Sequence, residues 1–312
     1  MRPVVLVLTH GRDHFVPERV LEAVDALGGH GVRVNTEDYP HALDLELRVG
    51  DDGARVGRYG DVRGVYLRRL ASPALPDQPP EVRRMVAGEA RLHWAALGDV
   101  LDGARWVNPP VAEARVEGHK LHQLRRARAA GLRVPETLVT SDPEAARAFA
   151  ARHGHDVVVK LLGALSHTMD GQGTRMPTTP LGADDLEALD GLRAGPMCLQ
   201  PRLPSTRELR VVWVDGEVFV GAVETDRDAV DWRSTSGRWL PHELDDGTRT
   251  AVDRLMRDLG LTMGALDLLL PADGGAPWFL EVNPSGEWGM LEAFLELPVS
   301  RAVARSLLGE AT

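Results

Sequence analysis

Apolar runs and segments of helical periodicity alternate along the first third of the chain. Residues 4–9 (VVLVLT) form a continuous β-rich apolar run, which is typical of a buried strand. Residues 16–27 carry apolar side chains at helical spacing and end at Gly28 and Gly29. A short segment with alternating valines, VRVN, follows at 32–35. This order predicts a strand, a helix and a second strand, which is the start of an α/β fold.

Turn signals divide the rest of this region. The sequence GDDG at 50–53 separates two alternating segments and predicts a β-hairpin. A proline-rich stretch at 71–80 predicts a loop because proline removes backbone donors. We expect a strand near 64–70, a helix near 81–101 and a short strand at 105–108. The first domain is predicted to close at Asn108, before two prolines.

The next region opens with a helical segment, 117–131, that Gly131 terminates. A strand is expected at 134–140, followed by a helix with Asp142 as its N-cap and Pro143 at its first position. Residues 155–162 (HDVVVKLL) form a β-branched strand with Lys160 at its centre. Because valines and leucines flank it, we expect Lys160 to face an anion. A polar loop with three glycines follows, and Gly171 and Gly173 there would allow backbone amides to approach phosphates.

Two further strands, at 208–214 and 217–225, are joined by an Asp-Gly turn and predict an antiparallel hairpin. Side chains alternate along a strand, so Glu208 and Arg210 share one face while Leu209 and Val211 point to the other. A functional role for Arg210 and an exposed ion pair on a solvated sheet face are both compatible with this segment alone.

Two apolar strands near the end of the chain, at 261–270 and 276–283, are separated by the turn sequence PADGGA. Each strand contains an isolated polar position. Glu281 and Asn283 lie on one face because they are two residues apart, and pairing of the strands could bring Asp267 beside them. Three oxygen-bearing side chains without histidine or cysteine suit Mg²⁺. The alternative is that local backbone groups satisfy these polar side chains.

Composition narrows the class of protein. The chain has 312 residues, of which 43% are hydrophobic and 26% are charged, so it can fold around a sizeable core and has length for about two domains. It contains a single cysteine, Cys198, which excludes an intramolecular disulfide framework. The net charge of −10 disfavours nucleic acid and anionic membranes as partners. No segment has the pattern of a signal peptide or a membrane span, so we expect a cytoplasmic protein.

The order and spacing of several motifs resemble the ATP-grasp ligases over about two hundred residues. The resemblance rests on two lysines, the glycine-containing loop, CLQP, ELR, an isolated aspartate and EVNPSGEW. It implies an α+β ATP-grasp fold with a pre-ATP-grasp domain at 1–108, a small lobe at 109–200 and a C-terminal lobe at 201–312. It also implies that ATP and Mg²⁺ are cofactors. The implied ligands are Lys120 and Lys160 for the phosphates, Gln200 near the adenine, and Asp267, Glu281 and Asn283 for Mg²⁺.

A narrower resemblance is to the microviridin-type ligases, the graspetide macrocyclases, which join side chains of a ribosomal precursor peptide. It is carried by VLTHGRDHFVPERV, NTEDYP, VYLRRL and DWR. The family's Asp-x-Arg signature falls on Asp231 and Arg233, and its paired arginines fall on Arg68 and Arg69, which implies substrate contact at these positions. The resemblance also implies a precursor peptide with leader and core as partner, and a homodimer.

The implied chemistry is activation of a carboxylate as an acyl phosphate, followed by attack of a hydroxyl or an amine. Arg210 would stabilise the carboxylate and the tetrahedral intermediate, and Asp231 or Glu208 would accept the proton of the attacking group. Three functions are therefore open. They are a peptide macrocyclase forming ω-ester or ω-amide bonds, a small-molecule carboxylate–amine ligase, and a catalytically silent nucleotide-binding protein.

Overall fold

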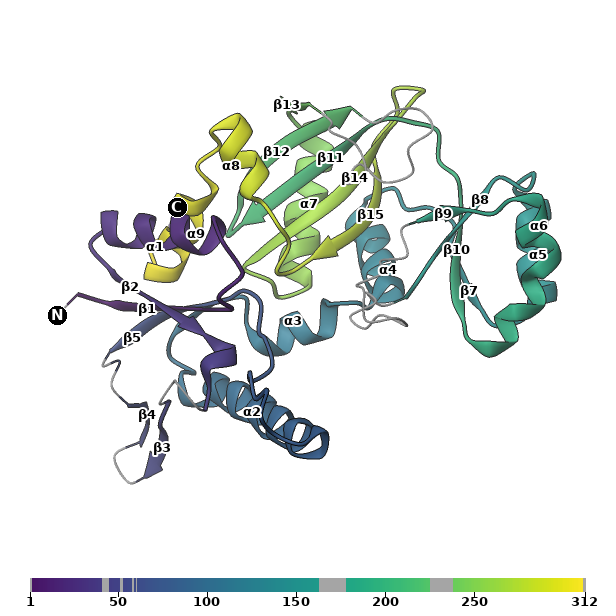
Figure 1. The fold of residues 1–312 in the computed structure, drawn as a ribbon. Coiled ribbons are helices and arrows are strands. Elements are labelled where there is room, and N and C mark those ends of the chain that lie inside the picture. The colour runs from purple at the N-terminus through teal and green to yellow at the C-terminus, as the bar shows by residue number, and fades with distance from the viewer. Residues whose placement is uncertain are drawn as a thin grey trace.

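The computed structural model describes residues 2–40, 45–50, 53–57, 59, 61–162, 178–224 and 238–310. In this part of the chain the strands form three main sheets and one two-stranded hairpin, with helices packed on the sheets. The N-terminal sheet and the small sheet lie at opposite ends of the molecule, and the large sheet lies between them (Figure 1). Within the described ranges, no helix combines the length and the apolar character needed to cross a lipid bilayer.

The N-terminal sheet is parallel throughout, and the predicted strand–helix–strand unit is confirmed. Its strands, in spatial order, are β2 (His30–Asn35), β1 (Val4–Thr9), β5 (Val62–Leu67) and β6 (Arg105–Val107). Helix α1 (Val16–Ala26) connects β1 to β2 and buries the side of the helix that carries Val16, Val20 and Val24. Because the strands are parallel, the loops that follow them gather at one edge of this sheet.

Other elements of the N-terminal region also match the sequence pattern. The predicted hairpin is formed by β3 (Leu47–Gly50) and β4 (Gly53–Val56). The predicted long helix is α2 (Pro80–Val100), which begins at a proline as its sequence indicates. A short 3₁₀ helix, η1 (Thr36–Asp38), follows β2, and helix α3 (Pro110–Val116) leads out of the N-terminal sheet.

The small sheet is antiparallel and lies at the far end of the molecule. Its spatial order is β7 (Leu138–Thr140), β10 (Met197–Pro201), β8 (Val157–Lys160) and β9 (Thr179–Pro180). Helix α5 (Pro143–Arg152) begins as predicted, because the side chain of Asp142 accepts a hydrogen bond from the backbone N–H of Glu144. Its buried residues, together with those of the 3₁₀ helix η2 (Ala188–Ala194), cover this sheet. Helix α6 (Ala183–Glu187) precedes η2.

The large sheet carries most of the predicted chemistry. Its antiparallel strands, in spatial order, are β13 (Trp239–Pro241), β12 (Glu217–Glu224), β11 (Ser205–Val214), β14 (Met263–Pro271) and β15 (Trp278–Asn283). The predicted alternation along β11 is confirmed. Leu209 and Val211 belong to the core on one face, whereas Val212 and Val214 belong to a separate core on the other.

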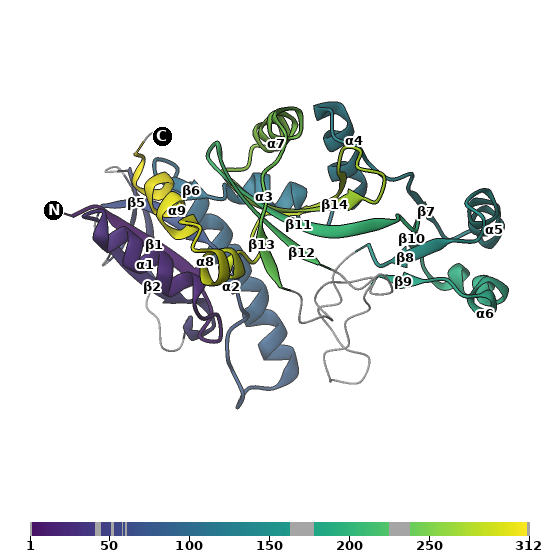
Figure 2. The ribbon, with the colours of Figure 1, turned by 90° about the horizontal axis from the view of Figure 1, so that it is seen from above.

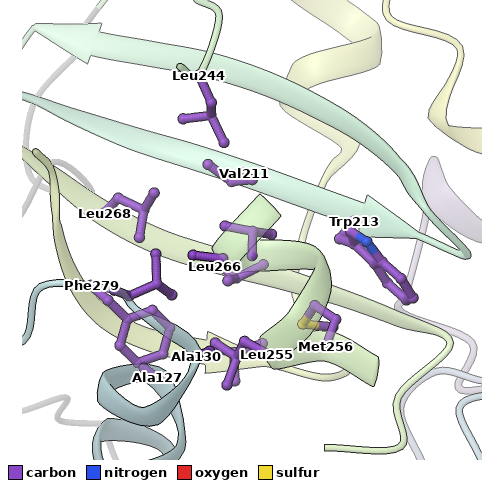
Figure 3. Close-up of a cluster of buried hydrophobic side chains, with 14 of the residues drawn as sticks. Ala127, Ala130, Val211, Trp213, Leu244, Leu255, Met256, Leu266, Leu268 and Phe279 are labelled. Carbon is purple, nitrogen blue, oxygen red and sulfur yellow. The ribbon is translucent and has the colours of Figure 1, made fainter. Parts of the chain in front are cut away.

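Helices α4 (Lys120–Ala130) and α7 (Asp246–Asp258) cover one face of the large sheet (Figure 2). Their apolar residues meet Val211, Leu266 and Phe279 in a buried core (Figure 3). Helix α4 ends where the sequence predicts, because Gly131 adopts the left-handed conformation with φ of 103°. The opposite face of the sheet carries Val212 and Val214 in the separate core and, farther along β11, the polar side chains of Arg210 and Glu208.

The last two helices connect the end of the chain to its beginning. Helices α8 (Gly289–Leu295) and α9 (Val299–Leu308) share a core with α1 and with strands of the N-terminal and large sheets. Helix α9 packs so closely on β5 that a Cβ atom at Gly64 would stand 2.4 Å from the carbonyl oxygen of Leu307. The division at 108 and 200 stays a prediction, and the predicted first and third domains are packed on each other.

Candidate active site

Three charged side chains form a row across the large sheet. Arg210 on β11 is paired with Asp267 on β14, and Asp267 is paired with Glu281 on β15. Residues that are paired across strands point to the same face, so the three side chains lie side by side. The expected proximity of Asp267 and Glu281 is thus confirmed by the strand register. The row lies on the face opposite α4 and α7.

A β-bulge makes this arrangement possible. Asp267 is paired with Glu281, but the next pair is Leu268 with Phe279, which leaves Leu280 as an extra residue on β15. The extra residue changes the alternation of the strand, so that Phe279 faces the core while Glu281 faces the polar side. Regular alternation would place these two side chains on the same face.

Asp267, Glu281 and Asn283 together offer oxygen donors for a cation. The side-chain nitrogen of Asn283 lies 3.4 Å from an oxygen of Asp267 and 3.4 Å from an oxygen of Glu281, so one amide group contacts both carboxylates. Two carboxylates and an amide form an all-oxygen donor set once the amide is turned, which is the chemistry that Mg²⁺ prefers. These residues therefore fit Mg²⁺, and they would hold it beside the row.

Lysine side chains offset the charge of Glu281. Lys120, at the start of α4, places its Nζ atom 2.5 Å from the carboxylate of Glu281. Burial alone would raise the pKa of Glu281, but Lys120, with help from Lys160 and Asn283, lowers it to about 2. The carboxylate is therefore ionised at neutral pH, as a metal ligand must be.

Lys160 approaches the same site from the small sheet. It is paired with Cys198 across β8 and β10, and Gln200 is two residues farther along β10 on the same face. Burial lowers the pKa of Lys160, while the negative charge of Glu281 opposes this effect. The predicted phosphate ligands Lys120 and Lys160 thus come from two different parts of the fold and are both close to Glu281. Gln200 is buried and donates to the hydroxyl of Thr137 over 2.9 Å.

The end of β15 and the loop after it, which together we call the metal loop (residues 283–287), are held by hydrogen bonds to backbone carbonyl groups. Asn108 donates to the carbonyl of Pro284 over 3.1 Å. Arg68 donates to the carbonyls of Ser285 (3.0 Å) and Gly286 (3.3 Å). Arg210 donates twice to the carbonyl of Glu287, over 3.0 and 2.8 Å, and places its remaining Nη atom 2.6 Å from Asp267. Four successive carbonyl groups are therefore bound by three side chains.

Arg68 and Arg69 share two carboxylates but differ in exposure. The side chain of Arg68 is fully buried, and it contacts Asp13 at 3.1 Å and Glu287 at 2.5 Å. The side chain of Arg69 is 42% exposed, and it lies 3.5 Å from Asp13 and 3.2 Å from Glu287. Of the two paired arginines predicted to contact substrate, only Arg69 has substantial exposed surface.

Several residues that support the metal loop were not among the predicted site residues. They are Asp13, Asn108, Glu113 and Glu287. Glu287 lies inside the EVNPSGEW motif and Asp13 inside HGRDHF, so motif context was the available signal for both. Glu113 accepts a hydrogen bond of 2.8 Å from the hydroxyl of Ser285, and burial raises the pKa of Glu113 to about 7.

The remaining predicted residues are of two kinds. Glu208 is half-buried on β11, two residues from Arg210 and on the same face. Arg210 is buried and is paired with Asp267, which excludes the exposed ion pair on a solvated face that its segment also permitted. Four other predicted positions lie outside the described residues: Asp231, Arg233, Gly171 and Gly173.

Comparison with known proteins identifies the family. The family model described as the MvdD pre-ATP grasp domain matches residues 4–114. Macrocyclase MdnB from Microcystis aeruginosa MRC is 37% identical, with 98% of this chain and 99% of that chain covered and a TM-score of 0.80. Macrocyclase MdnC from the same organism, solved with precursor peptide MdnA, is 28% identical, with 98% and 99% covered and a TM-score of 0.87.

A third structure is the ATP-grasp ligase PsnB complexed with a minimal precursor, Mg and ADP. It is 26% identical to this chain, with 98% of this chain and 96% of that chain covered and a TM-score of 0.76. A search of curated proteins returned no match. The similarity to MdnB extends over nearly the whole of both chains, and the predicted lysines and oxygen ligands converge in the structure. The chain therefore belongs to the family of ATP-grasp macrocyclases that act in the biosynthesis of ribosomally made, modified peptides.

Proposed function

We propose that this protein is an ATP-dependent ligase that closes macrocycles in a ribosomal precursor peptide through ω-ester or ω-amide bonds. The observation that carries the proposal is the convergence of Lys120 and Lys160 on the row of Arg210, Asp267 and Glu281. It occurs in a chain that is similar over its full length to peptide macrocyclases. Such a site serves phosphoryl transfer because it combines cations with oxygen ligands for a metal.

The reaction would proceed in two balanced steps. An oxygen of an Asp or Glu side chain of the peptide attacks the γ-phosphorus of ATP, and ADP leaves, which yields an acyl phosphate. A Ser or Thr hydroxyl, or a Lys amine, then attacks the acyl carbon, and inorganic phosphate leaves as the ester or amide forms. The attacking group loses its proton to a carboxylate, for which Glu208 and Asp231 are the candidates.

The charged residues divide this work between them. Lys120 and Lys160 bind the phosphates of ATP, and Gln200 lies near the adenine, with Gly171 and Gly173 supplying backbone amides. When bound, Mg²⁺ supplies positive charge that offsets the charge of the transferring phosphoryl group. Arg210 stabilises the carboxylate and the oxyanion that follows from it. The nitrogens of Arg210 donate to Asp267 and to the metal loop, so Arg210 would act on these groups through its fixed positive charge and not through a direct hydrogen bond.

The peptide substrate is proposed to have a leader segment and a core segment. Arg69 contacts the peptide, as do Asp231 and Arg233 of the Asp-x-Arg signature. The partly exposed guanidinium of Arg69 lies beside Glu287 of the metal loop, which supports a substrate contact near the metal. A homodimer and a location in the cytoplasm belong to the same proposal.

The test is mass spectrometry of a candidate precursor peptide after incubation with the protein, ATP and Mg²⁺. Loss of one water mass per ring, dependent on ATP, is the expected result, and fragmentation then locates each link. An unchanged peptide, in a preparation that releases ADP when free amino acids are supplied, would assign the protein to the small-molecule carboxylate–amine ligases. An unchanged peptide in a preparation that binds ATP without hydrolysing it would indicate a silent nucleotide-binding protein.

A further inference from the structure

We propose that Arg68 is a positioning residue for the metal loop and makes no contact with the peptide, although its neighbour Arg69 does. The inference rests on the proposed function, because it assigns different tasks to two arginines that sequence resemblance places together at the substrate. It begins from burial: the side chain of Arg68 has no exposed surface, whereas that of Arg69 is 42% exposed.

Each of the three guanidinium nitrogens of Arg68 donates within the protein. Its Nε atom donates to Asp13, its Nη1 atom to the carbonyls of Ser285 and Gly286, and its Nη2 atom to the carboxylate of Glu287. Arginine has five N–H donors in a rigid planar fork, and here the fork spans both the buried Asp13 and the metal loop. A peptide carboxylate could reach Arg68 only by displacing these partners.

The contacts of Arg68 lead directly to a predicted metal ligand. Ser285 and Gly286 belong to a turn in which the N–H of Gly286 donates to the carbonyl of Asn283 over 3.0 Å. Holding the carbonyls of this turn therefore fixes the backbone at Asn283, whose side chain contacts Asp267 and Glu281. Partners that orient metal ligands are typically worth about 10-fold to 100-fold in metal affinity.

Arg68 also connects two parts of the molecule that are far apart in the sequence. It follows β5 of the N-terminal sheet, and its carbonyl partners lie more than two hundred residues later, after β15 of the large sheet. Asp13, which follows β1, holds Arg68 from the other side and itself accepts a hydrogen bond from Thr9. The loops at the carboxyl edge of the N-terminal sheet thus hold the metal loop in place through hydrogen bonds from Arg68.

Lysine substitutions separate the two roles. Arg68→Lys keeps a positive charge between Asp13 and Glu287, so the pair of carboxylates stays compensated. A single ammonium cannot reproduce the fork that binds the loop carbonyls and Asp13 together. Arg69→Lys is the contrast because Arg69 has the same two carboxylate neighbours and donates to no loop carbonyl in its described contacts. Arg63→Lys, at an exposed position on β5, is the control.

The metal is followed with Mn²⁺ as the probe, by electron paramagnetic resonance, in the presence of ADP and without peptide. Binding of a fluorescently labelled precursor peptide is measured separately by anisotropy. For Arg68→Lys we expect the Kd of Mn²⁺ to rise by about 10-fold or more and the Kd of the peptide to stay the same. For Arg69→Lys we expect the Kd of the peptide to rise, and Arg63→Lys should match the parent protein in both assays.

A rise in the peptide Kd with an unchanged Mn²⁺ Kd for Arg68→Lys would overturn the inference, as would no change in either. Should Arg68→Lys lose its cooperative melting transition, Glu287→Gln provides the second variant. It weakens the contact between Arg68 and the loop from the loop side, and the same weakening of Mn²⁺ binding is expected. If the parent protein failed to cyclise peptide, the proposed function would be rejected. The Mn²⁺ measurement would still test the role of Arg68, because it is made without peptide.

Discussion

Glu281 is half-buried, ionised at neutral pH and paired with a cation, which makes it the most sensitive single position for the metal assignment. Glu281→Gln removes the negative charge that would bind Mg²⁺ and that holds Lys120. We expect ADP formation to fall by on the order of 100-fold, with the melting temperature retained. Glu89→Gln, at an exposed position on α2, is the matched control. Normal turnover in Glu281→Gln would show that this carboxylate is not a metal ligand.

The raised pKa of Glu113 predicts that the free energy of unfolding depends on pH. Its pKa is raised by burial to about 7 from the ordinary 4.5, so the folded protein retains a proton that the unfolded chain releases. The stabilisation is fully present below pH 4.5 and is lost as the pH rises through 7, and it amounts to roughly 3 kcal/mol. Glu113→Gln should remove this fall and be the more stable protein at pH 8.

Urea unfolding of both proteins at a series of pH values between 4 and 8 provides the measurement. Other ionisable groups contribute equally to the two profiles, so the difference between them isolates Glu113. Parallel profiles would mean that Glu113 titrates in the folded protein as it does in the unfolded chain.

Among single residues, the sequence pattern singles out polar side chains that interrupt apolar strands. Asp267, Glu281 and Lys160 were identified in this way, because burying a charged side chain among apolar residues costs free energy unless a partner or ligand compensates the charge. The structure confirms that Asp267 and Glu281 lie side by side, and their ligand roles stay predictions. Asn108 and Glu113 gave no such signal. Their importance comes from partners near residues 262 and 284, and such long-range contacts are set by the packing of the sheets.

At the scale of elements, the metal loop depends on a close approach at Gly286. A Cβ atom there would stand 2.5 Å from Cβ of Ala265 and 2.8 Å from an Nη atom of Arg210. Gly286→Ala should therefore displace the loop, lower ligase activity and reduce the free energy of unfolding by about 1–3 kcal/mol. Chemical denaturation and ADP release provide the two measurements.

The control for this substitution is Gly88→Ala on α2, where a Cβ atom meets nothing within 4 Å. It should leave ligase activity intact and stabilise the helix by up to about 1 kcal/mol. If Gly286→Ala retained ligase activity and stability as Gly88→Ala does, the close contacts of a Cβ atom at position 286 would not constrain the metal loop.

Element prediction was most accurate where turn chemistry and periodicity agree. The parallel unit of β1, α1 and β2, the hairpin of β11 and β12, and the Asp142 cap of α5 were all predicted correctly. The bulge at Leu280 was not predicted, because the strand continues on both sides of it and only pairing with β14 reveals the extra residue. The sequence pattern placed Glu281 and Asn283 on one face without showing how Phe279 reaches the other.

At the scale of the whole molecule, α9 is the contact that joins the end of the chain to the N-terminal sheet. Gly64→Ala would place a methyl group 2.4 Å from the carbonyl oxygen of Leu307, so the helix must move away. We expect the free energy of unfolding to fall by about 1–3 kcal/mol and the C-terminal helix to become more susceptible to protease. Gly103→Ala, in an open turn, is the control.

An unchanged protease pattern in Gly64→Ala would indicate that the helix and the strand adjust without separating.

Long-range packing of this kind could not be predicted from the sequence, because no local pattern indicates which face of one element will meet another. Family resemblance supplied the overall arrangement instead, and the ligands that it assigns to each segment stay predictions. It did not distinguish Arg68 from Arg69, since adjacent residues after a strand look alike until their burial is known.

Exchange of N-terminal segments between related ligases is an attractive way to build hybrid enzymes with new peptide preferences. The support of the metal loop sets a rule for such hybrids. Arg68, Asp13 and Asn108 would come from one parent, while the loop carbonyls and Glu287 would come from the other. A working junction must therefore preserve this set of contacts as a unit, and cutting the chain at the linker after residue 108 would not be sufficient by itself.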